Sequence, residues 1–371
     1  MNNERKITEF FAAANSGRGF VNFYPKIFYK RGIERRYLIK GGPGTGKSTF
    51  MRIIAQNASF AGYDVEYYRC SSDPSSLDAI ILGGRIAIMD ATSPHIADAD
   101  IAGAREELVD LGAFWYSKGL FSERGRIEEL SRMKKMRYAR AYEFLGAAMK
   151  IDESDRKLAA SYIDLEKINS AAQRTVAKIP KGTGFDMRIG ICDSVGMKGR
   201  VRLDTYERMA KKLYIIQDFL KSGTEFLKKL VDFAKENGNK ITVSYFPVNT
   251  DHPDAVFFEE SGDAFVLRDL AKVGDEVYPC ECVYINMKRF VKKTADIAEI
   301  KKAKKEIAHD TRMLRELIAL AIKELEIAGD HHFELEKIYR KYMDFDAEDA
   351  FAKRFSNSVI KSMPELDATE Y

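Results

Sequence analysis

The stretch that decides the fold is YLIKGGPGTGKSTFMRIIAQ, residues 37–56. Apolar residues at its start predict a strand, and the apolar spacing from Phe50 onward predicts a helix. Between them lies the pattern G-x-x-x-x-G-K-[ST], a loop whose backbone N–H groups surround a phosphate at the start of a helix. The residues that fit its fixed positions are Gly41, Gly46, Lys47 and Ser48.

Each residue of this loop has a chemical role. Glycines adopt positive φ angles and leave no Cβ in the space of the phosphates. Lys47 supplies a mobile cation for the β- and γ-phosphates, and the Ser48 hydroxyl is placed to bind Mg²⁺. The predicted nucleotide-binding residues are Gly41, Gly42, Pro43, Gly44, Thr45, Gly46, Lys47, Ser48 and Thr49.

Composition is that of a soluble globular protein, with 45% hydrophobic and 31% charged residues in a chain of 371. The net charge of +4 is small beside 60 basic and 56 acidic side chains, so the totals do not indicate a nucleic-acid binder, although local clusters could still serve. No apolar run approaches the ~20 residues of a membrane span. The N-terminal segment has too short an apolar stretch for secretion. We therefore expect a cytoplasmic protein without membrane contact.

The sequence repeats itself. At an offset of 176, residues 36–82 lie over 212–258 without a gap, and residues 16–24 fit 196–204 at an offset of 180. Strands alternate with helices in each half, which predicts an α/β fold with two tandem repeats, each with a mainly parallel sheet. The chain would then be an intramolecular pseudo-dimer.

Each half ends in a long helical tract. We predict domains over 1–180 and 181–371, each closed by a helical hairpin, at about 123–175 and about 296–343. The predicted turns of these hairpins lie at Asp152–Asp155 and near Gly329–His332.

The second repeat has lost the phosphate loop. Positions 217–225 read QDFLKSGTE, so side chains of Leu220 and Ser222 replace glycines and Gly223 stands in place of Lys47. One nucleotide site per chain is expected. The second half is either a partner that closes over this site, with Lys221 reaching it like an arginine finger, or a structural remnant.

A carboxylate for Mg²⁺ is expected where a buried strand ends. The segment IAIMD ends in Asp90, which we predict to hold the metal together with Ser48. Thr92 then supplies a hydroxyl contact. His95 either senses the γ-phosphate or is a hydrogen-bonded histidine of the loop. Ala91 stands where a water-activating Glu often follows, which argues against fast hydrolysis.

Three further features have two readings each. Asp73 is either the base that faces a phosphate acceptor or part of a turn and cap. The basic tract Arg132, Lys134, Lys135, Arg137 and Arg140 is either a charge-clamping lid or a solvated helix face. For Trp115, with Phe114 and Tyr116, core packing is favoured over a base-stacking platform.

With the loop GGPGTGKST, the segment SSDPSSLDA, the strand exit DATSPH and the duplication, the chain resembles a family of uncharacterised bacterial tandem P-loop proteins, loosely labelled ATPases or nucleotide-kinase-like. This resemblance implies ATP binding on a P-loop NTPase fold. Members carry a loop in both halves and a Gly after the strand-end Asp; this chain departs at both places. We expect ATP and Mg²⁺ as ligands.

The expected function is a slow ATPase whose nucleotide state sets the arrangement of the two halves. The catalytic residues would be Lys47, Asp90 and His95, with Asp73 if there is an acceptor. A small-molecule or nucleotide kinase and a non-catalytic ATP-gated interaction module are the alternatives. No N-K-x-D guanine-reading motif occurs in a strand-end context, which favours ATP over GTP.

Overall fold

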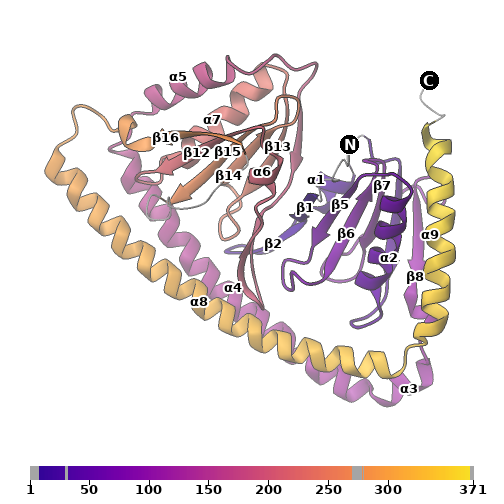
Figure 1. Cartoon of the computed structure of the whole chain (residues 1–371). Coiled ribbons are helices and arrows are strands. Elements are labelled where there is room, and N and C mark those ends of the chain that lie inside the picture. Colours follow the sequence, from indigo (N-terminus) through magenta and orange to yellow (C-terminus); the bar gives the residue numbers. More distant parts are fainter. Residues whose placement is uncertain (1–7, 30–31, 270–277, 279, 368–371) are drawn as a thin grey trace.

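The computed structural model describes residues 8–29, 32–269, 278 and 280–367. It has an α/β architecture in which the described residues form two repeats, each built on a six-stranded sheet (Figure 1). Two long helices run beneath both repeats and join them. Among these residues, no helix combines the length and the apolar character that crossing a membrane requires.

The first repeat opens with three short strands, the helix α1 and the strand that leads into the phosphate loop. Its elements are β1 (Thr8–Phe11), β2 (Ala13–Ser16), β3 (Gly19–Asn22), α1 (Tyr24–Phe28), β4 (Arg35–Lys40), α2 (Lys47–Phe60), β5 (Val65–Arg69), β6 (Leu77–Leu82), β7 (Ile86–Asp90), β8 (Glu106–Asp110), the 3-10 helix η1 (Leu111–Phe114), α3 (Ser117–Ser122), α4 (Arg124–Ala160) and α5 (Leu165–Val176).

The second repeat follows the same plan. Its elements are β9 (Asp186–Ile189), β10 (Asp193–Gly196), β11 (Gly199–Arg202), α6 (Thr205–Met209), β12 (Lys212–Asp218), α7 (Gly223–Glu236), β13 (Lys240–Tyr245), β14 (Pro253–Phe258), β15 (Asp263–Asp269), β16 (Glu281–Asn286), the 3-10 helix η3 (Met287–Phe290), α8 (Ile297–Lys341) and α9 (Phe345–Asp367).

The two sheets have the same strand order. The first is β1-β5-β6-β7-β4-β8, and the second is β9-β13-β14-β15-β12-β16 when read from the matching edge. In each sheet a single strand, β6 or β14, runs antiparallel to its neighbours. The predicted two-repeat α/β fold with mainly parallel sheets is therefore confirmed, and the strand order, which the sequence does not reveal, is now defined.

Strand pairing corrects the internal alignment by one residue. Lys40 lies opposite Asp110, and Gln217 lies opposite Asn286; the two opposing residues cap η1 and η3 in the same way. Lys40 thus corresponds to Gln217, one position beyond the offset of 176 that α2 and α7 keep. The gapless match predicted across 36–82 is wrong at this strand, because the loop of the second repeat is one residue shorter.

The long helices are continuous. α4 runs through Asp152–Asp155 and α8 through Gly329–His332, so both predicted turns are wrong. Arg156 pairs with Asp152 at 2.7 Å, one turn apart, and so keeps the acidic segment helical. Gly329 is buried against the side chain of Met197, so its missing side chain allows close packing rather than a turn.

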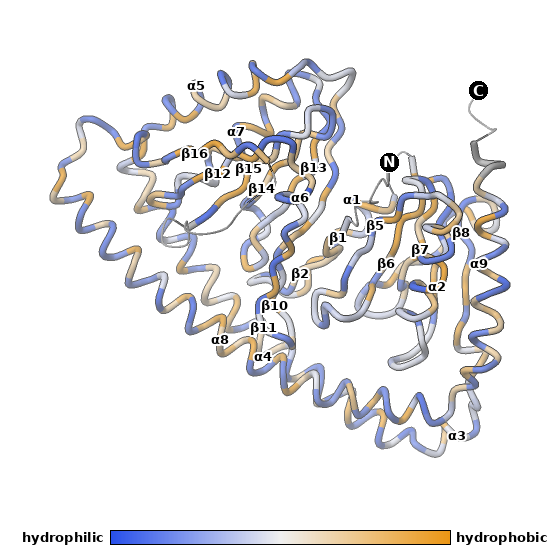
Figure 2. The backbone as a smooth tube through the Cα atoms, viewed as in Figure 1, coloured by the Kyte–Doolittle hydropathy of each residue, from blue (hydrophilic) through white to orange (hydrophobic). Residues whose placement is uncertain are grey.

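The terminal helix of each repeat packs on the other repeat. α4 packs along α8, α5 packs on α7 of the second repeat, and α9 packs on α2 of the first (Figure 1). Neither predicted hairpin forms: α5, at the end of 123–175, packs on the other repeat, whereas 296–343 is almost entirely the single helix α8 and the exchanged helix α9 begins only at Phe345. Figure 2 shows apolar residues gathered in the two sheets and the helices on them, whereas apolar and polar residues alternate along α4 and α8.

The exchanged helices complete the cores. Ala352, Val359 and Met363 of α9 are buried with Phe50 and Met51 of α2. On the other side, α5 is strongly amphipathic and buries Ile168, Ala171, Ala172 and Val176 against α7. Because each core lacks one wall without the borrowed helix, the two repeats are expected to stabilise each other.

Candidate functional site

The loop Gly41–Gly46 leads from the carboxyl end of β4 into α2. Gly44 and Gly46 have φ angles of +68° and +79°, which an L side chain rarely adopts. Gly46 is also the N-cap residue of α2, and it provides no side chain to accept from the first-turn N–H groups. These N–H groups and the positive end of the helix dipole therefore face the loop without a side-chain cap from the N-cap residue.

Lys47 and Asp90 meet beside this loop. The Lys47 Nζ lies 3.6 Å from Asp90 Oδ2, and it donates to the carbonyl oxygens of Gly41 (3.0 Å) and Gly42 (2.7 Å). The strand pairing explains this meeting, because β4 and β7 are parallel neighbours in which Ile39 lies opposite Asp90. The structure thus brings together two of the predicted site residues.

The predicted metal ligands are held by their own surroundings. The Ser48 hydroxyl oxygen accepts from the Leu77 N–H at 3.0 Å, and Asp90 Oδ1 accepts from the Thr92 N–H at 2.9 Å and from its hydroxyl. No group of three His, Cys, Asp or Glu side chains that could hold a metal occurs within the described ranges. This donor set fits Mg²⁺, which uses one or two protein oxygens and completes its shell with phosphates and water.

His95 lies in a buried pair that the sequence does not reveal. Its Nε2 is 3.2 Å from Asp78 Oδ2, and its ring stacks on Tyr24 with centroids 4.7 Å apart. Burial acts to lower the pKa of His95, but Asp78 and then Asp90 outweigh it, and the pKa is raised. Asp78 is present here because antiparallel β6 begins at the edge where β4 and β7 end.

Asp73 lies in a local turn. Its Oδ1 accepts from the Ser75 N–H at 3.1 Å and from the Ser75 hydroxyl at 2.7 Å. The side chain therefore acts as an Asx-type turn acceptor, which corresponds to the structural reading of this residue.

The basic tract of α4 divides into two groups. Arg137 and Arg140 each pair with Glu324 of α8 at 2.9 Å, so they join the two long helices. Lys134 is half-buried: burial lowers its pKa, and the charges of Lys135 and then Lys47 lower it further. Its positive charge therefore acts on the same region as that of Lys47.

Side chains of the second repeat surround the loop of the first. The ring of Tyr339 lies against Gly42, the backbone of α8 lies against Gly44 at Glu336, and the carboxylate of Glu348 lies against Gly46. Burial raises the pKa of Glu348 to about 7, with a further contribution from Asp349. Sequence reasoning missed these residues because it kept each helical tract with its own repeat.

The second loop carries its own anion. Asp218 Oδ1 accepts from the backbone N–H of Gly223 at 2.8 Å, at the start of α7. Leu220 and Lys221 adopt φ angles of 50° and 57°, and Lys221 Nζ pairs with Asp152 at 3.0 Å. Lys221 thus serves the second repeat and does not act as a finger on the first loop.

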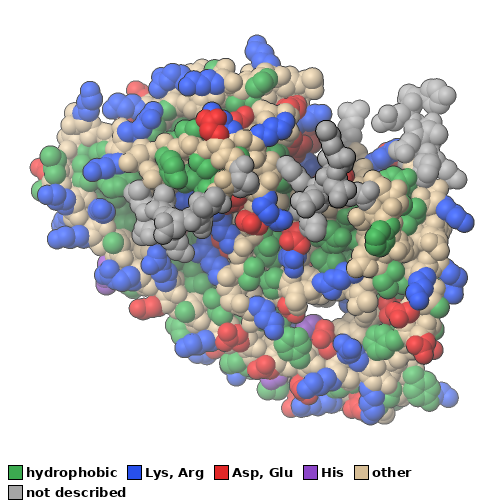
Figure 3. Space-filling view, viewed as in Figure 1, with side chains coloured by type: hydrophobic (Ala, Val, Ile, Leu, Met, Phe, Trp, Pro, Cys, Tyr) green, Lys and Arg blue, Asp and Glu red, His purple; other side chains and the backbone are tan. Residues whose placement is uncertain are grey.

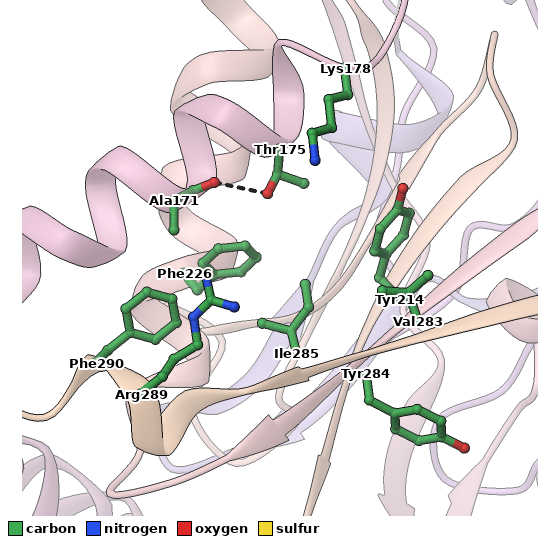
Figure 4. A pocket seen from close by; sticks show the side chains of 10 residues that line it. All are labelled: Ala171, Thr175, Lys178, Tyr214, Phe226, Val283, Tyr284, Ile285, Arg289 and Phe290. Carbon is green, nitrogen blue, oxygen red and sulfur yellow. Dashed lines mark hydrogen bonds between the residues drawn. The ribbon is translucent and has the colours of Figure 1, made fainter.

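Two cavities lie beside the sheets, one in each repeat. One of about 210 Å³ opens between α5 and β16 in the second repeat, where Phe226, Phe290 and Ile285 form apolar walls and Lys178 lies toward the rim (Figure 4). Another of about 200 Å³ is lined by Arg52, Tyr67 and neighbouring residues of the first repeat. Figure 3 shows an opening between the first repeat and the long helices, with basic, acidic and histidine side chains at its rim.

The loop, the strand-end carboxylate and the borrowed helices define the candidate site by geometry alone. No family model, no curated protein and no solved structure matches the chain.

Proposed function

We propose that the protein binds one Mg²⁺·ATP per chain at residues 41–49, on a P-loop NTPase fold, and hydrolyses it slowly. The observation that carries this proposal is the approach of Lys47 to Asp90 at 3.6 Å beside an uncapped helix N-terminus. A cation, a carboxylate and free N–H groups at one point are the parts that a metal-bound triphosphate requires.

Each residue of the site has a separate role in binding the nucleotide. Lys47 exchanges its bonds to loop carbonyls for the β- and γ-phosphate oxygens, and the α2 N–H groups hold the phosphates in place. Ser48 and Asp90 would hold Mg²⁺, which neutralises charge on the phosphates when bound. Lys134 adds positive charge from α4. Turnover is slow because Ala91 offers no carboxylate to orient the attacking water.

Nucleotide binding is coupled to the arrangement of the two repeats. Gly42, Gly44 and Gly46 touch Tyr339, Glu336 and Glu348 respectively, all on helices that the second repeat contributes. A ligand that reshapes this loop therefore changes the docking of α8 and α9. Because the loop contacts α8 and α9 differently with and without nucleotide, the arrangement of the two repeats depends on the nucleotide.

A non-catalytic ATP-gated module is the second candidate, and Ala91 is the residue that favours it. A kinase has less support, because the Asp73 carboxylate is engaged by Ser75 in its own turn. Nucleotide binding without turnover would identify the gated module, whereas turnover that needs an added acceptor would identify the kinase.

Calorimetry with Mg²⁺·ATP tests the proposal. Wild-type protein should bind one nucleotide per chain, and Lys47→Ala should abolish binding at the same protein concentration. Lys40→Ala is a matched control, because Lys40 Nζ donates to the Ala91 and Ala97 carbonyls at the same sheet edge, outside the loop. Wild-type protein that binds no nucleotide, or Lys47→Ala that binds normally, would refute the assignment.

A further inference from the structure

We propose that Trp115 and Tyr339 form the base-binding part of the nucleotide site, so that the nucleotide bridges the loop of the first repeat and a helix of the second. This inference rests on the proposed function and extends it from the phosphates to the base. The ligand class is a nucleotide whose purine ring stacks on an aromatic side chain.

The fold brings both rings to the loop. β8 is the neighbour of β4 on the outer side of the sheet, and Lys40, the last residue before the loop, lies opposite Asp110, the last residue of β8. Trp115 follows directly after η1. Ligands of such sheets bind outside the carboxyl ends of the strands, so a base beside the β4 phosphate loop comes next to the segment that follows β8.

Tyr339 comes from the opposite direction. It lies near the end of α8, and a Cβ placed on Gly42 would come within 2.8 Å of its ring. The rings of Trp115 and Tyr339 have centroids 5.5 Å apart and are tilted by 54°. Both residues are partly exposed, so this pair forms an aromatic corner at the edge of the loop rather than part of a closed core.

The indole N–H needs an acceptor. The Nε1 of Trp115 is buried and has no hydrogen-bond partner among the residues that the structure describes. Buried Trp N–H groups usually donate a hydrogen bond, and an unpaired one costs free energy. A ring nitrogen of a base or a ribose oxygen supplies the missing acceptor.

The second repeat serves as an internal comparison. Backbone bridges pair Trp115 with Met343 and, in the second repeat, Val291 with Ile163, so Trp115 corresponds to Val291. Matching hydrogen bonds, Tyr116 N–H to Tyr342 O and Lys292 N–H to Tyr162 O, extend the same equivalence. Tyr339 and Ala159 each lie three residues before the tyrosine that accepts this bond, so Ala159 takes the position of Tyr339.

Both aromatic residues therefore lie beside the intact phosphate loop, one from each repeat, and small aliphatic residues take their places beside the degenerate loop. Packing between helix ends does not require them, since the matching bridge between Val291 and Ile163 forms with Val291 and Ala159 in their places. The loop and the aromatic pair have changed together, which is expected if both contact one ligand.

The experiment compares Mg²⁺·ATP with Mg²⁺·tripolyphosphate, which has the phosphates but no base. Trp115 is the one tryptophan of the sequence, so its fluorescence reports on this corner directly. ATP should change the emission and bind about tenfold or more tightly than tripolyphosphate, the range that base stacking provides. Trp115→Ala and Tyr339→Ala should each lose about that factor for ATP and leave the Kd of tripolyphosphate unchanged.

Controls separate this inference from the proposed function. Phe121→Ala removes an aromatic ring that is 73% exposed and should leave both affinities unchanged. If wild-type protein binds ATP and tripolyphosphate equally, or if the two variants weaken both ligands equally, the base site is refuted while the phosphate site stands. If wild-type protein binds neither ligand, the proposed function itself fails. Trp115→Phe, which keeps a ring, should retain most of the ATP affinity and covers the case in which an alanine variant misfolds.

Discussion

Asp218 accepts a hydrogen bond at 2.8 Å from the backbone N–H of Gly223, so the loop of the second repeat supplies a carboxylate to its helix, whereas the loop of the first repeat supplies no side-chain cap. Asp218 follows Gln217, the counterpart of Lys40, and thus takes the position of Gly41, the first glycine of the loop. Burial raises the pKa of this carboxyl, while the Gly223 N–H acts to lower it. In the second loop, the Asp218 carboxylate therefore takes the place that a bound anion would occupy.

Asp218→Ala is therefore expected to destabilise the second repeat. It leaves the Gly223 N–H without its acceptor, at a cost of about 1–2 kcal/mol in the free energy of unfolding. Asp218→Asn keeps an acceptor oxygen and should cost less, which urea unfolding of the two variants can show. If Asp218→Ala unfolds like wild-type protein, the hydrogen bond is not a cap.

Neither variant should create a second nucleotide site. The loop stays one residue shorter than its counterpart, and a side chain at Gly223 would meet Leu267 at 2.2 Å, which also excludes Gly223→Lys as a restored phosphate lysine. Calorimetric stoichiometry should remain one nucleotide per chain. Two nucleotides bound to any of these variants would contradict this account.

Asp90→Asn should separate metal binding from phosphate binding. Asparagine keeps an oxygen that can accept from the Thr92 N–H, so the turn after β7 is retained, but the negative charge beside Lys47 is lost. Mg²⁺ should then strengthen ATP binding about tenfold less than in wild-type protein, as expected when a metal site loses a charged ligand. Asp98→Asn, whose side chain is 84% exposed, is the control. An unchanged Mg²⁺ dependence in Asp90→Asn would exclude Asp90 as a ligand.

The parts of the site that lie close together in sequence could be predicted. The glycine pattern and its flanking strand and helix defined the loop, and the apolar run before Asp90 placed that carboxylate at the same edge, since buried parallel strands read as continuous apolar segments. Asp78 was missed because it stands at the start of an antiparallel strand. Its proximity to His95 depends on strand order, which local patterns do not encode.

The exchange of helices could not be predicted for a different reason. An amphipathic pattern shows which face of α5 or α9 is apolar, but the two repeats are so alike that either α2 or α7 offers a suitable partner. Helix length decides the outcome. α8 has 45 residues and is about 67 Å long at 1.5 Å per residue, so it carries α9 past its own repeat to the other. The predicted turn near Gly329 concealed that length.

Glu348 is expected to make the docking of α9 depend on pH. Burial raises its pKa from an ordinary 4.5 to about 7, so the folded protein binds this proton more tightly than the unfolded chain. Stability should therefore fall as pH rises from about 4.5 to about 7. Glu348→Gln removes the titration, and it should raise the free energy of unfolding at pH 8 by up to about 3 kcal/mol relative to wild-type protein.

Urea unfolding at pH 5, 6, 7 and 8 measures this effect. Glu129→Gln, a carboxylate on α4 that is 51% exposed, should leave the pH profile unchanged. α5 and α9 are the equivalent terminal helices of the two repeats, and the residue of α5 at the position of Glu348 is the buried Ile168. Glu348→Ile should therefore also stabilise the first repeat. Identical pH profiles for wild-type protein and Glu348→Gln would show that the Glu348 carboxyl does not titrate while α9 is docked on the first repeat.

The pair of His95 and Asp78 is expected to titrate in a higher window. The pKa of His95 is raised, so its stabilising contribution is fully present below the ordinary value of 6.5 and is lost as pH rises through the folded value. Asp78→Asn removes the charge that outweighs burial, and burial alone lowers the pKa of a histidine. NMR titration of the His95 ring should therefore give a pKa above 6.5 in wild-type protein and at least about one unit lower in Asp78→Asn. An unshifted value in the variant would mean that another group, such as Asp90, holds the His95 proton.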